Sequence, residues 1–135
     1  MEFLCGEDYK PLLPDKVYDA QCIKYDEGFC LGKARKLFLY FKIVEPGEHH
    51  GKVIFMPFNI PYDKRIKQGS KYYKAWVKVN NYEKPSRNAI MSPRLFKNKV
   101  FRIKTRTVEP KDGNKALPKQ FHYSVVDYII EMLAG

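Results

Sequence analysis

The segment Arg35–Val44, RKLFLYFKIV, has the clearest strand pattern in this chain of 135 residues. Successive side chains of a strand point to opposite faces of the sheet, so residues two apart share a face. One face of this segment is entirely apolar and is formed by Leu37, Leu39, Phe41 and Ile43. The other face carries Phe38, Tyr40 and Lys42. We therefore predict a long strand that buries its apolar face in a core.

The residues that follow predict a hairpin. Glu45–Gly51 (EPGEHHG) is a turn cluster, and the next apolar run, Lys52–Ile60 (KVIFMPFNI), begins directly after it. Two apolar runs separated by a turn cluster are typical of an antiparallel hairpin. Because proline has no backbone N–H to donate, Pro57 marks an edge position or a bulge in the second strand.

The residues before this hairpin contain one more strand pattern. Lys16–Tyr25 (KVYDAQCIKY) is β-prone and follows a Pro-Asp turn signal. Asp26–Ala34 contains Gly28 and Gly32, so we predict a loop there. Residues 1–15 are predicted to form an extended N-terminal arm.

A helix is predicted after the hairpin. Ser70 is a suitable N-cap, and Tyr72, Trp76 and Val79 then fall at helical spacing. The helix should therefore begin after Ser70 and end near Asn80. Because this spacing sends Tyr72 and Trp76 to the same side, it favours Trp76 as a core residue rather than a binding residue.

The rest of the chain contains one clear strand and one ambiguous segment. Ser92-Pro93 predicts a single helical turn, since proline suits the first helical position. Lys99–Val108 (KVFRIKTRTV) alternates apolar and basic residues and predicts a strand. Pro110–Pro118 is predicted to be a flexible loop. Phe121–Leu133 fits a strand or a helix, and its periodicity does not decide between them.

The predicted order is strand, strand, strand, helix, strand, strand. This order matches the five-stranded OB barrel, with a helix between its third and fourth strands. A barrel would hide the apolar face of every strand and would remove the sheet edges. An SH3-like barrel and an open α+β sheet fit the order less well but stay open. The length suits one domain with its own core, so we predict a single mainly β domain over residues 1–135.

Positive charge is concentrated in one third of the chain. The formal net charge is +10. Residues 64–108 hold fourteen Lys or Arg and one acid, Glu83, which gives this stretch a charge of +13, while the remainder sums to −3. Such a block predicts a polyanionic partner. The alternative is a solvated basic face without a partner, and phospholipid is disfavoured because no basic segment forms a long amphipathic helix.

Basic side chains at strand spacing are the first candidates for contacts with a polyanion. Arg102, Lys104 and Arg106 alternate on one strand face, which places neighbours roughly 7 Å apart, close to the spacing of phosphates in nucleic acid. The alternative is a solvent-exposed face with distant counter-charges. Loop cations extend the predicted set, because arginine binds phosphate oxygens bidentately. They are Lys64, Arg65, Arg87 and Arg94.

Aromatic residues beside lysines are the second group of candidates. Phe38 and Tyr40, with Lys42 on the same strand face, are placed to stack on bases. A helix or loops can cover that face, so stacking and core burial are equally open for Phe38, while stacking is favoured for Tyr40. In the run KYYKAWVK (71–78), Tyr73 is the binding candidate because Lys71 and Lys74 flank it.

Motifs for catalysis or metal binding are missing. His49-His50 lies in a turn and no zinc-ligand spacing occurs, so no metal site or cofactor is expected. The motifs GxxxxGK[ST], GxGxxG and GxSxG do not occur, and the basic stretch has too few acids for a metal-dependent nuclease. No enzymatic activity is expected. The three cysteines are expected to be reduced thiols; they are Cys5, Cys22 and Cys30. The N-terminal residues lack the pattern of a secretion signal and no apolar run is long enough to span a membrane, so we expect a cytoplasmic protein.

Short motifs in the second part of the chain suggest a family. They are GSKYY followed by Trp76 (69–76), PSR (85–87), MSP (91–93), FKNKVF (96–101) and YSVV (123–126). In this order they resemble a group of small uncharacterised proteins that bacteriophages and integrated mobile elements encode near replication genes. The resemblance implies a replication or recombination accessory, such as an OB-type single-stranded DNA-binding protein. By this resemblance, the residues of interest are Tyr72, Tyr73, Arg87 and Arg94, which either bind DNA or stabilise the fold. Unlike typical single-stranded DNA-binding proteins, the chain has no Gly-rich tail with an acidic end to recruit partners.

The sequence thus predicts a domain that binds single-stranded DNA largely regardless of sequence during replication or recombination. We expect the cations of residues 64–108 to gather on one concave surface with Tyr40 and Tyr73 among them. Replication proteins of the same element are candidate partners, whereas a membrane or a small-molecule substrate is not expected. The rival hypotheses are an adaptor that docks its basic face on an acidic protein, a binder of RNA or duplex DNA, and a nuclease.

Overall fold

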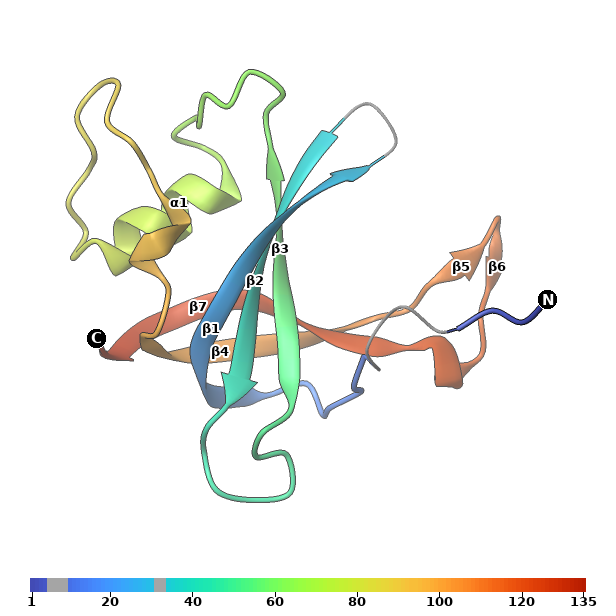
Figure 1. The fold of residues 1–135 in the computed structure, drawn as a ribbon. Coiled ribbons are helices and arrows are strands. Elements are labelled where there is room, and N and C mark those ends of the chain that lie inside the picture. Colours follow the sequence, from blue (N-terminus) through green and yellow to red (C-terminus); the bar gives the residue numbers. More distant parts are fainter. Residues whose placement is uncertain (5–9, 31–33) are drawn as a thin grey trace.

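The computed structural model describes residues 1–4, 10–30 and 34–135 of the chain. Its main element is a five-stranded antiparallel sheet with the strand order β3-β2-β1-β4-β7, and one α-helix follows the third strand (Figure 1). The predicted mainly β class and the position of the helix are therefore confirmed. Gly32, predicted to lie in a loop, and Cys5, predicted to be a free thiol, fall outside the described residues.

The elements of the described chain have the following bounds: β1 (Val17–Cys30), β2 (Ala34–Ile43), β3 (Val53–Ile60), α1 (Lys71–Val79), η1 (Pro93–Leu95), β4 (Val100–Val108), β5 (Lys111–Asp112), β6 (Lys115–Ala116), η2 (Lys119–Phe121) and β7 (Tyr123–Ala134). The 3-10 turn η1 lies where Ser92-Pro93 predicted a helical turn. Within the described ranges, no helix is long and apolar enough to cross a membrane.

The predicted hairpin of β2 and β3 is confirmed. The two strands pair along their length, from Arg35 opposite Ile60 to Lys42 opposite Val53. Because β3 is the last strand on its side of the sheet, Pro57 lies in an edge strand, as its missing N–H requires.

The first strand is longer than the sequence predicted, and the loop expected over Asp26–Ala34 is largely wrong. β1 continues to Cys30, and β2 already begins at Ala34. The glycine that suggested a loop instead makes room for a ring. A Cβ at Gly28 would lie 3.3 Å from Phe38 Cε2, so glycine at this strand position lets the aromatic side chain of the paired strand approach closely.

β1 connects two parts of the sheet because it bends along its length. Val17–Gln21 pairs with β4, whereas Ala20–Cys30 pairs with β2. The register with β2 shifts between Cys22 and Lys24, which marks a bulge. Bulges increase strand twist and bend, so β1 leaves β4 and continues along β2. Figure 1 shows β4 and β7 crossing β1, β2 and β3.

The structure decides the last segment of the chain. The ambiguous residues 121–133 form the end of η2 and most of β7, which pairs with β4. The segment Pro110–Pro118, predicted to be a flexible loop, instead contains the short hairpin of β5 and β6, whose turn uses Gly113 at a φ of 63°. The end of the N-terminal arm is attached to β7, since Leu13 N–H donates to Ser124 Oγ (2.7 Å).

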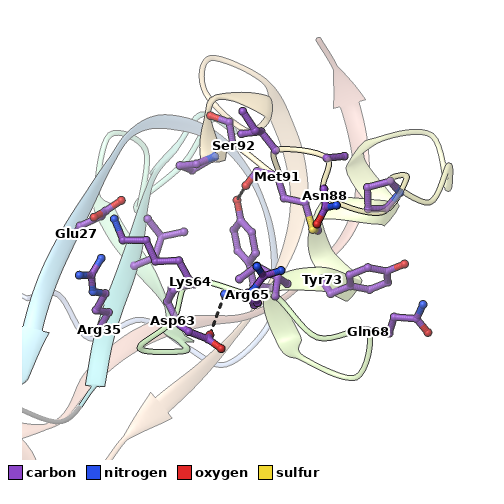
Figure 2. A pocket seen from close by; sticks show the side chains of 18 of the residues that line it. Glu27, Arg35, Asp63, Lys64, Arg65, Gln68, Tyr73, Asn88, Met91 and Ser92 are labelled. Carbon is purple, nitrogen blue, oxygen red and sulfur yellow. Dashed lines mark hydrogen bonds between the residues drawn. The ribbon is translucent and has the colours of Figure 1, made fainter.

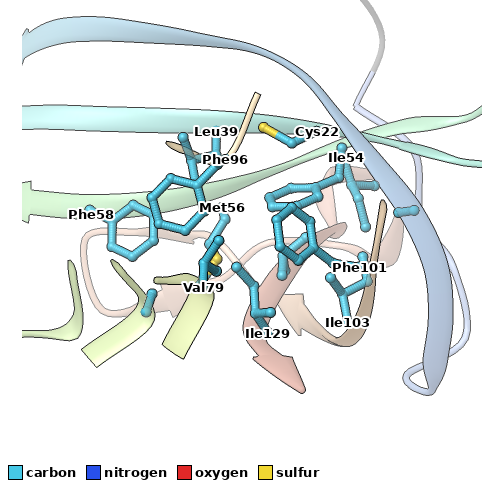
Figure 3. Packing of buried hydrophobic residues seen from close by; sticks show 14 of the residues in the cluster. Cys22, Leu39, Ile54, Met56, Phe58, Val79, Phe96, Phe101, Ile103 and Ile129 are labelled. Atoms are coloured by element: carbon cyan, nitrogen blue, oxygen red, sulfur yellow. The ribbon is translucent and has the colours of Figure 1, made fainter. Parts of the chain in front are cut away.

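The core is formed by the inward-facing side chains of the sheet, joined by the buried side of α1. The predicted N-cap is confirmed, because Ser70 Oγ accepts a hydrogen bond from Tyr73 N–H (3.2 Å). Trp76 is buried as predicted, and its indole N–H donates to Ser92 O (3.1 Å). Figure 3 shows the packed apolar side chains, which include Cys22, Leu39, Ile54, Met56, Phe58, Val79, Phe96, Phe101, Ile103 and Ile129.

The two edge strands of the sheet approach each other. Phe55 of β3 and Tyr123 of β7 have ring centroids 6.0 Å apart. In the described part of the chain, however, no backbone ladder joins β3 to β7. The sheet is therefore strongly curved, with side-chain contacts between its edges.

Cys22 is expected to be chemically protected. Its side chain is fully buried, and burial raises the pKa of the thiol to about 12. Because the thiolate is the reactive form, iodoacetamide should modify Cys22 slowly at pH 8 in the folded protein and rapidly in denaturant. The Cys5→Ser/Cys30→Ser variant isolates this signal for mass spectrometry. Rapid modification without denaturant would contradict the burial.

The same burial makes stability depend on pH. Since the pKa of the Cys22 thiol is raised in the folded state, the stabilisation due to the protonated thiol is lost as pH rises from 9.0 towards about 12.

Candidate nucleic-acid interface

Four aromatic side chains form a cluster on the outward face of the sheet, and we call them the aromatic face. They are Phe38 and Tyr40 of β2, Phe55 of β3 and Tyr123 of β7, and all four are partly exposed. Ring centroids are 5.5 Å apart for Phe38 and Phe55 and 6.4 Å apart for Tyr40 and Phe55. Lys42, predicted together with Phe38 and Tyr40, is exposed two residues beyond Tyr40 on the same face of β2.

Strand alternation explains why these rings point outward. Leu39 is fully buried, so its neighbour Tyr40 lies on the opposite face of β2. On β3, Ile54 and Met56 are buried, and Phe55 between them points away from the core. The same alternation that fills the core therefore places a row of rings on the other side of the sheet.

Two lysines lie against the aromatic face. Lys10 Nζ is 4.9 Å from the ring centroid of Tyr123 and 5.7 Å from that of Phe55. Lys24 Nζ is 4.7 Å from the ring centroid of Tyr40, which is its partner residue in the ladder between β1 and β2. These distances are within the range of cation–π attraction. Each lysine holds a positive charge close to an aromatic surface.

Sequence reasoning missed half of this face. Phe55 could have been predicted, because the alternation in Lys52–Ile60 puts it on the strand face opposite to that of its apolar neighbours. Tyr123 and Lys10 had no local signal, since they join the face only through the pairing of β7 and the path of the arm. Lys24 had none either, because its partner depends on the register after the bulge in β1.

The second feature is a groove of about 980 Å³, which we call the basic groove. It lies between the ends of β1 and β2 and the two loops of residues 61–69 and 85–92. Figure 2 shows Glu27 and Arg35 on one side of it and Tyr73 and Asn88 on the other. Its cationic lining residues are Arg35, Lys36, Lys64, Arg65 and Arg87. Its acidic lining residues are Glu27 and Asp63, so the lining has an excess of positive charge.

The loop on the helix side of the groove is held in place by two partly buried hydrogen bonds. The Tyr72 hydroxyl donates to Met91 O (2.6 Å), and the Trp76 indole N–H donates to Ser92 O (3.1 Å). Tyr72 is buried, and burial raises the pKa of its phenol, so it stays a neutral donor. Tyr73, the next residue on α1, is partly exposed and lines the groove.

The predicted basic stripe on β4 is largely compensated by acids. Arg102 Nε lies 3.2 Å from Asp19 Oδ1, and its Nη1 lies 3.0 Å from Glu131 Oε1. Arg106 Nε lies 3.3 Å from Asp127 Oδ1. These acids come from β1 and β7, the strands that flank β4 in the sheet. A phosphate would have to compete with a carboxylate at both arginines.

The helix lysines lie at a different place, where α1 meets β3 and β7. Lys71 Nζ donates to Pro57 O (3.4 Å). The pKa of Lys71 is lowered by burial and by the nearby Arg106, while Asp127 acts in the opposite direction. Lys74 lines a small cavity of about 260 Å³ together with Asp127.

Two other predicted residues lie outside both features. Lys104 Nζ donates to Thr105 O (2.8 Å) on its own strand. Arg94 is exposed on η1 and does not line the groove. The structure thus divides the predicted residues among several places instead of one concave surface. Phe38 and Tyr40 belong to the aromatic face, with Lys42 beside them on β2, and the basic groove contains Lys64, Arg65, Tyr73 and Arg87.

Comparison of the chain with known protein families and with curated proteins found no match to either. The case for a function therefore depends on the geometry of these two surfaces.

Proposed function

We propose that the protein is an OB-type domain that binds single-stranded DNA without catalysing a reaction on it. The strand order β3-β2-β1-β4-β7 supports this fold, because the first strand of an OB domain pairs with both the second and the fourth. The bend in β1 and the approach of β3 to β7 are the features that barrel closure needs. The family resemblance adds a setting, the replication or recombination of a phage or mobile element.

The observation that carries the proposal is the position of the aromatic face. OB domains bind oligonucleotides on their second and third strands, between the loop after the first strand and the loop before the last. Phe38, Tyr40 and Phe55 lie on the second and third strands here. The connection between the fourth and fifth strands of the sheet contains the hairpin of β5 and β6.

The chemistry of the face suits single strands. A base of a single strand exposes its flat surface, and stacking on an aromatic side chain is worth about 1–3 kcal/mol per base. Stacking of this kind tolerates any base, so little sequence preference is expected. Lys24, Lys42 and Lys10 surround the rings and can neutralise the phosphates between stacked bases. A duplex hides the flat surfaces of its bases, so it gains only the electrostatic attraction between its phosphates and the lysines.

The test is a titration of fluorescently labelled oligo-dT by anisotropy at two salt concentrations. If about five phosphates are neutralised, the plot of log affinity against log salt should have a slope near −3 to −4. Unlabelled single-stranded DNA should compete strongly, and duplex DNA should compete weakly. Anisotropy is preferable to tryptophan fluorescence, because Trp76 is buried and bonded to Ser92.

Three results would contradict the proposal. Competition by poly-glutamate as strong as that by single-stranded DNA would indicate an adaptor for acidic proteins, because poly-glutamate has negative charge but no bases. Stronger competition by duplex DNA or RNA would indicate a different nucleic acid. Cleavage of the oligonucleotide when Mg²⁺ is added would indicate a nuclease.

A further inference from the structure

Three cations of the basic groove, Lys64, Arg65 and Arg87, differ from the arginines of the β4 stripe in their surroundings. In the described part of the chain, no carboxylate lies within ion-pair distance of Lys64, Arg65 or Arg87. Asp63, the acid next to Lys64, accepts a hydrogen bond from the backbone N–H of Arg65 (3.0 Å). The five cations of the lining outnumber its two acids, so the cations repel each other, and a bound anion relieves that repulsion.

Each groove loop contains one residue in the left-handed backbone region. Lys64 has a φ of 61°, in the left-handed region that lysine seldom adopts, and Asn88 has a φ of 66° in the same region, which asparagine tolerates better. Such conformations persist only where the surrounding structure holds them. The Tyr72–Met91 and Trp76–Ser92 hydrogen bonds hold the second loop. Contacts with α1 therefore fix the end of the second loop at Met91 and Ser92.

The groove is connected to the aromatic face along β2. Lys36 lines the groove and lies two residues before Phe38 on the same face of the strand. At strand spacing this is roughly 7 Å, about one nucleotide step. Tyr73 gives the groove an aromatic surface of its own beside its cations. The groove therefore has both cations and an aromatic ring, the two kinds of group that bind a single strand, and it lies next to the Phe38 end of the aromatic face.

We infer that the basic groove is a second binding site for the same single-stranded DNA, which takes the phosphodiester backbone beyond the segment stacked on the aromatic face. This inference rests on the proposed function. In the bound state, Lys64, Arg65 and Arg87 contact phosphate oxygens, and Tyr73 stacks on a base. A short oligonucleotide fills the aromatic face only, whereas a longer one occupies both sites.

The experiment compares two lengths of oligo-dT with one variant and its matched control. Lengths of about 5 and about 16 nucleotides span the range of site sizes known for OB folds. The variant is Arg65→Gln/Arg87→Gln, and the control is Lys16→Gln/Lys97→Gln, which removes the same charge from exposed residues outside the groove. Thermal melting of all proteins confirms that each is folded.

The groove variant should bind the 16-mer about tenfold more weakly than the wild type and the 5-mer equally well. Its salt slope on the 16-mer should be flatter by about 1.4, because each lost phosphate contact contributes about 0.7. The control should keep both affinities and the slope close to wild type. A groove variant that matches the control on the 16-mer, or that loses affinity for both lengths equally, overturns the inference and leaves the proposed function standing. Failure of the wild type to bind either length overturns both.

Discussion

Replacing Phe101 with alanine is expected to lower the free energy of unfolding by about 3–5 kcal/mol. Phe101 is fully buried in β4, and its ring centroid lies 6.0 Å from that of Phe41 and 6.3 Å from that of Phe96. Alanine would leave a cavity next to Phe41 of β2 and Phe96, the residue after η1, that the packed strands cannot fill. Domains of this size are stable by only about 5–15 kcal/mol, so the loss would be a large fraction of the total. Urea denaturation followed by circular dichroism measures the change.

The chain contains a matched control for this substitution. Phe121 of η2 is 53% exposed, so Phe121→Ala removes the same atoms without opening a cavity in the core. Its effect should stay within about 0.5 kcal/mol, as for most surface substitutions. Similar losses from Phe101→Ala and Phe121→Ala would mean that the cluster around Phe101 is not the core of the protein.

The double variant Tyr40→Ala/Phe55→Ala is expected to bind the 16-mer of dT at least about 30-fold more weakly than the wild type. Each ring supplies a stacking surface worth about 1–3 kcal/mol, and a loss of 1.4 kcal/mol is tenfold in affinity. The salt slope should change little, because no cation is removed. This combination of a large loss in affinity with an unchanged slope separates the aromatic face from the basic groove. Anisotropy titrations at several salt concentrations give both quantities.

Two further variants control this experiment. Tyr40→Phe keeps the ring and should bind nearly as the wild type does. Tyr82→Ala removes an exposed tyrosine, 71% accessible, that lies outside both surfaces, and it should have no effect. Because Phe55 also contacts Phe38 and Tyr123, the melting temperature of the double variant must be compared with that of the wild type. A folded double variant with unchanged affinity would show that DNA does not stack on this face.

Several parts of the structure followed from local patterns. The alternation in Arg35–Val44 predicted which side chains of β2 enter the core, and the Ser70 cap predicted where α1 begins. Trp76 was assigned to the core from its helical spacing with Tyr72, and both are buried. These properties depend on residues a few positions apart, so the sequence pattern contains them.

The length of β1 and the nature of the last segment did not follow from local patterns. Gly28 indicates a loop when the chain is considered alone, but in the sheet it faces the Phe38 ring of the neighbouring strand. The segment Tyr123–Ala134 is a strand because it pairs with the backbone of β4. Strand pairing joins residues far apart in the chain, and a local pattern cannot show which partner is present.

The composition and the pattern of alternation by themselves determined a basic, mainly β chain, with one helix after its third strand and a core face on each long strand. Only the tertiary structure decided which cations keep their charge available to a partner. The sequence shows no partner for Arg102, yet Asp19 lies 83 positions away in the chain with its Oδ1 3.2 Å from Arg102 Nε. Arg65 and Arg87 meet no such acid in the described residues and share a groove with Tyr73. Electrostatic compensation depends on distance in space, and folding sets that distance through the order of strands in the sheet.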